Sequence, residues 1–499
     1  MKNILHLLTA ILRTDGYKPS QWLQYPPNTT HVSSYIESRG GEDESVFFGA
    51  RPWVMDYMTT PITMADILFA EMVFRVYGAP FNRAGWEIIV NEYNGYLPLE
   101  IQAIPEGTVM RVHNVQMQVT NTDSRLGWLT SYIETALLRG IWYPSTIATK
   151  SRKFKKILAK ALLKTSDMPV DVALNIALKF ALHDFGDRGV SSTESAVLGG
   201  MAHLVNFWGT DTIEGIIGAH VYYGADITNP DAPPVARTIP ASEHSTITSW
   251  GREHEVDAYE NMINQFSKPG SIYACVSDSY NIYAAVRELW GTKLRDKVIN
   301  SGGTLVVRPD SGDPMTVPIE VMDILAERFG YTTNSKGYKV LAKRADGSPI
   351  VKVIQGDGLN EYTIQVLVDN IIAAGYSLEN IAFGMGGGLL QAVNRDTLKY
   401  AMKASAIRIA NGEWTGFSKD PITDHGKKSK EGRLGLIFEC GVGSCGFRTV
   451  PEDVANKKEN LLSVIYRNGE TFFTGNFEDV RKRAELKVSD YAIVEMERY

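Results

Sequence analysis

Seven short polar or glycine-rich segments in the middle of the chain contain the residues whose types and spacing suit chemistry. Each segment follows a strand-like apolar run and precedes a stretch with helical spacing. Together they supply backbone amides, carboxylates, a histidine and arginines, which are groups that bind anions and hydroxyls. The segments are residues 183–189, 209–211, 242–245, 277–279, 308–312, 355–358 and 384–388.

A glycine run is one of these segments. Four of the five residues from 384 to 388 are glycine. Backbone N–H groups can approach a phosphate closely where no Cβ intervenes, particularly if a helix begins there. Leu389 stands where a dinucleotide-binding motif requires its last glycine. The run therefore predicts an anion cradle, including Gly386 and Gly387, rather than a dinucleotide site.

Two carboxylates stand at predicted strand ends beside sharp turns. Asp310 lies two residues after Arg308, and Asp357 directly follows Gly356. A ribose with two adjacent hydroxyls needs such acceptors, and a metal bound to a phosphate needs them as outer-shell partners. Aspartate is also a common turn former, so each carboxylate taken alone leaves both interpretations open.

His244 is a candidate for chemistry because it belongs to the same series of polar segments. A lone histidine is more often a structural residue. However, Glu243 is adjacent, and Asp278 comes from the next segment. Either carboxylate could hold one imidazole tautomer and leave the other ring nitrogen free for chemistry.

The alternation of strand-like and helix-like stretches predicts a parallel sheet with helices between its strands. Apolar residues recur at helical spacing over 317–325 and 364–371, which lie between successive polar segments. In a barrel, the loops that follow the strands share one face, and chemistry takes place there. Seven polar strand ends in one series therefore favour a (β/α) barrel over an open sheet.

Both flanks of this region alternate apolar and polar residues. Residues 97–120 alternate around a turn at 105–107, which predicts an antiparallel hairpin. Residues 433–475 show a similar pattern, with Asn468-Gly469 as a hairpin turn. We therefore expect an irregular (β/α) barrel catalytic domain over 146–404 and an antiparallel β-rich domain built from 1–145 and 405–499.

The 499-residue chain has a formal net charge of −6 and no long apolar run. We therefore expect neither a nucleic acid nor a membrane as a partner, and any anion binding must be local. The apolar stretch at 4–12 lacks a small-residue cleavage site, which argues against a signal peptide. Cys275, Cys440 and Cys445 are too few and too scattered for a disulfide framework, so we expect reduced thiols and a cytoplasmic location.

Through these and further motifs the sequence resembles the type II phosphoribosyltransferases, in particular those that use nicotinamide. The resemblance extends over nearly the whole chain and preserves the order of the motifs. It implies an irregular (β/α) barrel with an additional antiparallel β-rich domain. The matching motifs are residues 14–18, 24–29, 182–192, 209–212, 243–248, 277–280, 308–312, 354–358, 386–391 and 419–421.

The resemblance implies a homodimer that holds nicotinamide between two aromatic rings. Phe185 matches the residue that stacks on one face of the pyridine ring. Tyr17 matches the residue that covers the other face from the partner subunit. Asp211 matches the carboxylate that accepts a hydrogen bond from the carboxamide, and Arg308 matches a residue near the amide and the ribose.

The resemblance also implies a site for phosphoribosyl pyrophosphate. Asp310 matches a ribose acceptor, and Asp357 adjoins the phosphate cradle that Gly356, Gly386 and Gly387 match. The residues that match the pyrophosphate site are Arg188 and, from across the dimer, Arg39, Arg395, Lys403 and Lys419, while Lys427 matches a basic residue of a mobile loop.

The implied reaction joins nicotinamide to phosphoribosyl pyrophosphate and gives nicotinamide mononucleotide and pyrophosphate. His244 matches a histidine that ATP phosphorylates in this family, with Glu243 and Asp278 as its supports. Mg²⁺ is the implied cofactor, and Asp310 and Asp278 are candidates for its outer shell. Positioning and electrostatics do most of the catalysis, because nearby carboxylates stabilise the positive charge that develops on the ribose.

Alternatives stay open. A nicotinate phosphoribosyltransferase has the same fold, but Asp211 would repel the carboxylate of nicotinate. A non-catalytic signalling protein on this scaffold has no need of an intact Phe185, His244 and Asp310. A sugar hydrolase on a barrel would leave the glycine run unexplained. The positions that depart from the family pattern are Asp187, Ala274, Lys352, Met385 and Ala401.

Overall fold

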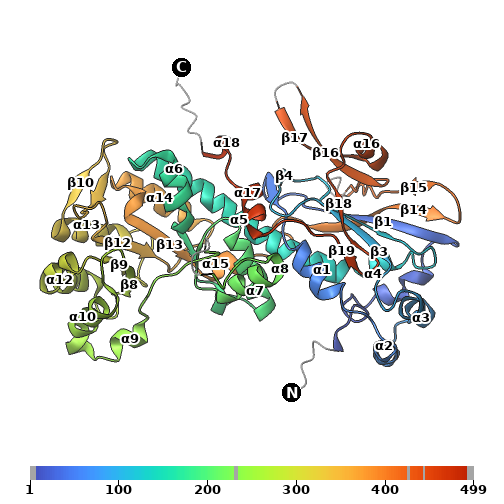
Figure 1. The fold of residues 1–499 in the computed structure, drawn as a ribbon, viewed down its shortest axis with the longest axis horizontal. Helices are drawn as coiled ribbons and strands as arrows, with labels where there is room; N and C mark the ends of the chain where they lie inside the picture. The colour runs from blue at the N-terminus through green and yellow to red at the C-terminus, as the bar shows by residue number, and fades with distance from the viewer. Residues whose placement is uncertain (1–6, 230–233, 424–427, 442–443, 492–499) are drawn as a thin grey trace. The chain divides into compact units, whose positions relative to one another are not determined.

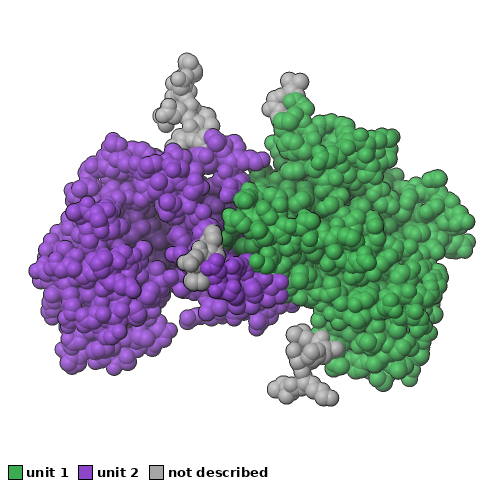
Figure 2. Space-filling view, in the orientation of Figure 1, with its two compact units in different colours: residues 1–149, 222–224, 393–484 green, residues 150–221, 225–392, 485–499 purple. Residues whose placement is uncertain are grey.

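The structure, a computed structural model, describes residues 7–229, 234–423, 428–441 and 444–491. The chain divides into two compact units (Figure 2). Unit 1 comprises residues 1–149, 222–224 and 393–484, and unit 2 comprises residues 150–221, 225–392 and 485–499. We expected divisions at 145/146 and 404/405, and the second of these would cut through a strand of unit 1.

Unit 1 is built on a seven-stranded antiparallel sheet (Figure 1). In order across the sheet, its strands are β15 (Trp414–Gly416), β14 (Ala401–Ile409), β1 (Thr29–Glu37), β5 (Met117–Asn121), β3 (Leu99–Ala103), β18 (Ser463–Arg467) and β19 (Glu470–Thr471). The N-terminal strands β1, β5 and β3 form the middle of this sheet, and strands from the C-terminal part of the chain lie on both sides of them, so the two flanks share one sheet. Two smaller sheets pair β2 (Glu44–Val46) with β4 (Val109–Arg111), and β16 (Leu434–Gly441) with β17 (Ser444–Pro451).

The predicted hairpins of the flanks have different outcomes. The one over 97–120 is wrong in its turn: β3 and β5 do pair antiparallel, but the turn at 105–107 leads into β4, which pairs with β2. The Gly107 N–H donates to the Phe47 carbonyl oxygen. This hydrogen bond ties the turn to the residue that follows β2, so that β4 pairs with β2. The Asn468-Gly469 turn is confirmed, since both residues have positive φ and join β18 to β19.

The helices of unit 1 surround this sheet system, and the long helix α5 continues into unit 2. They are η2 (Lys18–Leu23), α1 (Ala50–Tyr57), α2 (Met64–Tyr77), α3 (Arg83–Glu92), α4 (Leu129–Tyr132), α5 (Glu134–Thr165), α16 (Glu452–Lys457) and α17 (Phe477–Ala484). The core includes an edge-to-face cluster in which the Trp86 ring lies 5.1 Å from the rings of both Trp128 and Tyr132. Such contacts fix ring orientations in addition to burying apolar surface.

Unit 2 is built on a six-stranded sheet in which every ladder is parallel, as predicted (Figure 1). In order, its strands are β7 (Gly209–Thr210), β6 (Leu182–Asp184), β13 (Ile381–Met385), β12 (Val351–Gln355), β9 (Thr304–Arg308) and β8 (Ile272–Val276). No regular seventh strand closes the sheet within the described residues. Instead, Arg237 forms a parallel bridge to Gly209 of β7, and Ala241 forms one to Ala274 of β8. The barrel is therefore irregular, as the fold class predicted.

The helices of unit 2 follow its strands, and the two predicted examples are confirmed. Helix α13 buries Val317, Val321 and Ile324, and α14 buries Ile364 and Leu367. The helices are α6 (Val170–Val172), η3 (Ala173–Ala177), η4 (Leu178–Phe180), η5 (Asp187–Gly189), α7 (Thr193–Leu204), α8 (Ile213–Tyr223), α9 (His244–Thr248), η6 (Arg252–His254), α10 (Glu255–Phe266), α11 (Ile282–Ala284), η7 (Ala285–Lys293), α12 (Arg295–Asn300), α13 (Val317–Phe329), α14 (Thr363–Ala373), η8 (Leu378–Asn380), α15 (Gly387–Leu390) and α18 (Val488–Tyr491). A short hairpin joins β10 (Tyr331–Thr333) to β11 (Lys339–Leu341).

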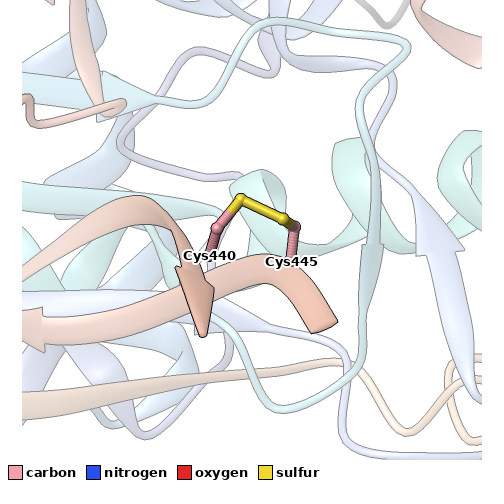
Figure 3. Close-up of a disulfide and its surroundings, with 2 residues drawn as sticks. All are labelled: Cys440 and Cys445. Carbon is pink, nitrogen blue, oxygen red and sulfur yellow. A yellow bond between two sulfur atoms is a disulfide. The ribbon is translucent and has the colours of Figure 1, made fainter. Parts of the chain in front are cut away.

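The cysteines correct one expectation. Cys440 and Cys445 form a disulfide near the tip of the β16–β17 hairpin (Figure 3). The expectation that all three thiols are reduced is therefore wrong for this pair. The hairpin register sets the two residues directly opposite one another, which their spacing in the sequence did not suggest. Cys275 is free and buried, and burial raises its pKa to about 12.

In the part of the chain that the structure describes, no helix is long and apolar enough to cross a membrane.

Candidate active site

A cavity of about 750 Å³ in unit 2 brings together residues from six of the seven polar segments. It lies where the strands of the parallel sheet end, which is the face of a barrel that carries chemistry. The residues that line it are Phe185, Asp187, Arg188, Asp211, Glu243, His244, Ser245, Arg308, Asp310, Gly356, Asp357 and Gly386. The remaining segment, 277–279, joins the site through Asp278, which contacts His244.

The imidazole of His244 lies between two carboxylates. Its Nε2 is 2.9 Å from Oδ1 of Asp278, whose side chain is 4% exposed. Its Nδ1 is 3.8 Å from Oδ2 of Asp310, which is beyond hydrogen-bonding distance. The tautomer that donates from Nε2 to Asp278 therefore leaves Nδ1 available to a ligand. Ser311 donates its hydroxyl to the other oxygen of Asp278, so that this carboxylate is held from both sides.

Glu243 has a different set of partners from the one we considered. Its carboxylate accepts from the hydroxyl of Ser245 and from the first turn of α9, where Glu243 is the N-terminal cap. It therefore fixes the start of the short helix that carries His244. The sequence left open whether Glu243 or Asp278 supports the imidazole, and in the structure Asp278 does so.

Asp310 stands in a group of charges. Burial raises the pKa of its carboxyl group, and Asp278 and Asp357 act in the same direction, whereas Arg308 and His244 oppose them. The Arg308 guanidinium lies 3.4 Å from Oδ2 of Asp310. A region with several carboxylates favours a bound cation or a carbon that develops positive charge.

The ring of Phe185 accounts for the absence of a side chain at two glycines that we assigned to phosphate binding. A Cβ at Gly384 would lie 2.0 Å from the Phe185 ring, and one at Gly356 would lie 3.0 Å from it. The ring therefore occupies space that only glycine leaves free at Gly384. The Phe185 N–H donates to the Met385 carbonyl oxygen at 3.0 Å, which fixes the backbone under the ring. Gly387 has no atom within 4 Å of such a Cβ, so its environment is open.

Asp211 is held at both its backbone and its side chain. Its N–H donates to the Asp184 carbonyl oxygen at 2.9 Å, and its Oδ1 accepts from the Thr238 hydroxyl at 2.6 Å. Asp184 is fully buried, and burial raises its pKa to about 6. Sequence reasoning missed Thr238, which lies in no motif, and Asp184, which lies in segment 183–189 but was given no role.

Most of the remaining predicted residues belong to unit 1. The side chain of Lys403 is largely buried, and burial lowers its pKa, with Arg39, Lys419 and Lys18 adding repulsion and Glu134 opposing. These cations therefore form one cluster on unit 1, whereas Arg188 lines the cavity of unit 2. Two predicted residues stand apart: Arg395 pairs with its neighbour Asp396 at 3.0 Å, and Lys427 lies outside the described residues.

Tyr17 also belongs to unit 1, and 60% of its surface is exposed. The backbone on both sides of it is anchored to the start of α5. Asp15 accepts from the Thr135 hydroxyl at 2.7 Å, and the buried ammonium of Lys18 pairs with Glu134 at 2.5 Å. A large exposed aromatic ring on a tightly held segment is typical of a contact surface.

Comparison with known proteins identifies the family. The sequence model of the nicotinate phosphoribosyltransferase (NAPRTase) family matches residues 180–470, and that of the nicotinamide phosphoribosyltransferase N-terminal domain matches residues 9–101. A nicotinamide phosphoribosyltransferase of Xanthomonas campestris is 48% identical over 96% of this chain and 99% of its own length. One of Acinetobacter baylyi is 29% identical over 96% of this chain and 97% of its own.

Solved structures agree on the fold. The nicotinate-nucleotide pyrophosphorylase of Pyrococcus furiosus superimposes with a TM-score of 0.59 at 18% identity, over 98% of both chains. Human nicotinic acid phosphoribosyltransferase superimposes with a TM-score of 0.51 at 15% identity, over 96% of this chain and 94% of its own. With a family match over more than half of its length and a 48% identical relative, this chain belongs to the nicotinate and nicotinamide phosphoribosyltransferase family of enzymes.

Proposed function

We propose that this enzyme transfers the phosphoribosyl group of phosphoribosyl pyrophosphate to nicotinamide, as the resemblance implied. The observation that carries the proposal is the Asp211 carboxylate, which lines the same cavity as Phe185 and Asp310. A carboxylate accepts a hydrogen bond from a carboxamide and repels another carboxylate. The name shared by the curated relatives supports the same substrate.

In the proposed reaction, Phe185 stacks on the pyridine ring and Asp211 accepts from its amide. The ring nitrogen bonds to C1 of the ribose as the C1–O bond to pyrophosphate breaks and its electron pair leaves with the pyrophosphate. C1 carries positive charge during this exchange, and the carboxylate of Asp310 stabilises it. Arg188 neutralises part of the negative charge of the leaving group.

Magnesium is part of this proposal as a metal that travels with the pyrophosphate. When bound, it withdraws negative charge from the leaving group. Among the described residues, no group of three or more His, Cys, Asp or Glu side chains could hold a metal. Asp278 and Asp310, the two carboxylates beside His244, would hold a hydrated metal as outer-shell partners.

The proposed enzyme is a homodimer with composite sites. Support comes from the distribution of residues between the units: the cluster of Arg39, Lys403 and Lys419 and the exposed Tyr17 ring belong to unit 1, while the ring and ribose residues belong to unit 2. A pyrophosphate group needs several cations, and Arg188 alone does not meet this need. A second subunit would supply the rest and cover the open face of the pyridine ring.

A competition assay tests the substrate. Purified enzyme receives phosphoribosyl pyrophosphate and magnesium with equal concentrations of nicotinamide and nicotinic acid, and both mononucleotides are quantified. We expect nicotinamide mononucleotide to dominate. Asp211→Asn should lower the preference about tenfold, because the carboxylate that repels nicotinic acid is gone. Asp187→Asn, a change of the same kind in the same cavity, is the control and should keep the preference.

Nicotinate phosphoribosyltransfer is the second candidate, because the matching family model carries that name. The same assay decides between the two. Dominant nicotinic acid mononucleotide in the wild-type enzyme would overturn the nicotinamide assignment and favour this alternative.

We further propose that ATP phosphorylates His244. The support is geometric, since Asp278 holds Nε2 and leaves Nδ1 as the nucleophile. The nitrogen would bond to the terminal phosphorus, and ADP would leave with the electron pair of the broken P–O bond. Labelled ATP and magnesium should give an acid-labile phosphoprotein that His244→Ala abolishes and His254→Ala retains. An acid-stable label, or a label kept in His244→Ala, would count against this role.

A further inference from the structure

We propose that Thr238 is a positioning residue that sets the specificity of the site by orienting Asp211. The Thr238 hydroxyl donates to Oδ1 of Asp211 at 2.6 Å. One carboxylate oxygen is thereby engaged, and Oδ2 remains for the amide of the substrate. This inference rests on the proposed use of nicotinamide.

The backbone under Thr238 is fixed on both sides. The Arg237 N–H donates to the Trp208 carbonyl oxygen at 2.8 Å, just before β7. The Pro240 carbonyl oxygen accepts from the Ala274 N–H on β8, also at 2.8 Å. Thr238 therefore lies on the irregular segment that spans the two edge strands of the barrel. A donor on so constrained a segment can define the direction of a carboxylate rather than follow it.

The acceptor is fixed as well. Asp211 directly follows β7, and its N–H donates to the Asp184 carbonyl oxygen at 2.9 Å. The side chain of Asp184 carries a second carboxyl group close to Asp211, and like charges disfavour one another at this range. The Thr238 hydroxyl offsets this repulsion at the oxygen it contacts, and so keeps the Asp211 carboxylate in place.

Thr238 also faces a second cavity. This space of about 370 Å³ is lined mainly by apolar side chains, among them Ile239, Val306 and Ile354. Asp211 lines the larger cavity of about 750 Å³. The hydrogen bond between the two residues thus lies where the ring-binding site meets the apolar interior of the barrel. A valine at position 238 keeps the branched shape of threonine and places a methyl group opposite Asp211, so the hydrogen bond is removed without a change of shape.

The direction of this hydrogen bond has a consequence for selectivity. A threonine hydroxyl has a single proton, and here it is given to Asp211. Thr238 therefore has no donor left for the carboxylate of nicotinic acid. The pair presents only acceptors to a ligand at this point, which suits the NH₂ of a carboxamide and rejects an acid on two grounds, charge and the absence of a donor.

The test compares Thr238→Val, which keeps the shape, with Thr238→Ser, which keeps the hydroxyl. In Thr238→Val we expect KM for nicotinamide to rise about tenfold or more, because a hydrogen bond to a charged group is lost. The ratio of kcat/KM for nicotinamide over that for nicotinic acid should fall by a similar factor. KM for phosphoribosyl pyrophosphate should stay within about twofold, and Thr238→Ser should recover most of the selectivity.

Several outcomes would overturn the proposal. Unchanged selectivity in Thr238→Val would show that Asp211 needs no such support. A serine variant that loses as much selectivity as the valine variant, although it keeps the hydroxyl, would show that the hydroxyl does not set the selectivity. If Thr238→Val does not fold, Thr238→Ala takes its place against the serine variant. The wild-type competition assay separates this failure from that of the proposed function. A wild-type enzyme that prefers nicotinic acid overturns both, whereas nicotinamide preference with an indifferent Thr238 overturns only this inference.

Discussion

The cavity of unit 2 and the cation cluster of unit 1 differ in how their charges are balanced. At the cavity, Asp278 contacts His244, His244 faces Asp310, and Asp310 pairs with Arg308, so each of these side chains has a polar partner. In the cluster, Lys403 is surrounded by Arg39, Lys419 and Lys18, with Glu134 as the carboxylate that opposes them. Side chains that are paired with one another keep their positions without a ligand, whereas a cluster of like charges gains stability when an anion binds.

The difference matches a division of labour. Ring and ribose need direction, which paired side chains and backbone hydrogen bonds supply. Pyrophosphate needs net positive charge, which an unbalanced cluster supplies. The two regions therefore make separate predictions: a change in the cavity should act on turnover or on the choice of ring, and a change in the cluster should act on the phosphorylated substrate.

The largest expected effect is that of Asp310→Asn, which removes a carboxylate from the cavity of unit 2. We expect kcat to fall by about 10²–10³-fold, because a preorganised charge next to the reacting carbon is lost. Initial rates at saturating substrates provide the measurement. Asp187→Asn lines the same cavity and should change kcat less than threefold. If both variants lose activity equally, the effect belongs to the cavity as a whole and not to Asp310.

Lys403→Met probes the cluster and should act differently. We expect KM for phosphoribosyl pyrophosphate to rise about tenfold or more, with little change in KM for nicotinamide, because one cation is worth roughly 1.5–3 kcal/mol when it bonds an anion. Arg408→Met, a loss of charge on the same strand β14, is the control. A rise in both KM values would remove the distinction between the two regions.

The same two variants test whether the regions meet across a dimer. Asp310→Asn and Lys403→Met are unfolded together, refolded as a mixture and assayed at a phosphoribosyl pyrophosphate concentration well below KM, where both parents are weakly active. If each site combines unit 2 of one subunit with unit 1 of another, half of the dimers are mixed and each mixed dimer has one intact site. Activity should then return to about a quarter of the wild-type value. A mixture no more active than its better parent would show that each site comes from a single chain.

The sequence allowed much of the cavity to be predicted but little of its support. Phe185, Asp211 and Asp310 follow parallel strands, and strand-following loops converge by topology alone. His244 follows the isolated bridge at Ala241. Thr238 follows no regular strand, so no periodicity pointed to it. Gly384 was assigned to an anion because sequence reveals a missing side chain but not the ring that fills its space. The disulfide depends on hairpin register, which the alternating pattern did not specify at its tip.

A smaller effect is expected from Asp184, which supports the cavity without lining it. Its folded pKa is about 6, above the usual 3.8, because of burial. Folding is therefore favoured when this group is protonated, and the stabilisation present below about pH 4 is lost as pH rises through about 6. The change is on the order of 3 kcal/mol. Asp184→Asn should flatten the fall in melting temperature between pH 4 and pH 7.

The control for Asp184 has the opposite sign. Hydrogen bonds from Ser348 hold the pKa of the exposed Asp346 below its usual value. Stability from this group is present above the usual pKa and is lost as pH falls. Asp346→Asn should therefore lose stability at neutral pH and approach the wild type in acid. If the melting temperatures of the two variants changed with pH in the same way, burial of Asp184 would not be the cause of the pH dependence.

The smallest effect is expected at the hairpin disulfide of unit 1, which contacts neither region. Replacing Cys440 and Cys445 with serine opens a short loop of six residues, since they are five apart in the sequence. Loops of this length give about 2 kcal/mol or less, so we expect a loss of a few degrees in melting temperature. KM for phosphoribosyl pyrophosphate should not change, because no residue of the cation cluster belongs to the β16–β17 hairpin. A shift in that KM would mean that the β16–β17 hairpin supports the cation cluster. The functional region of unit 1 would then extend from the cluster to most of that unit.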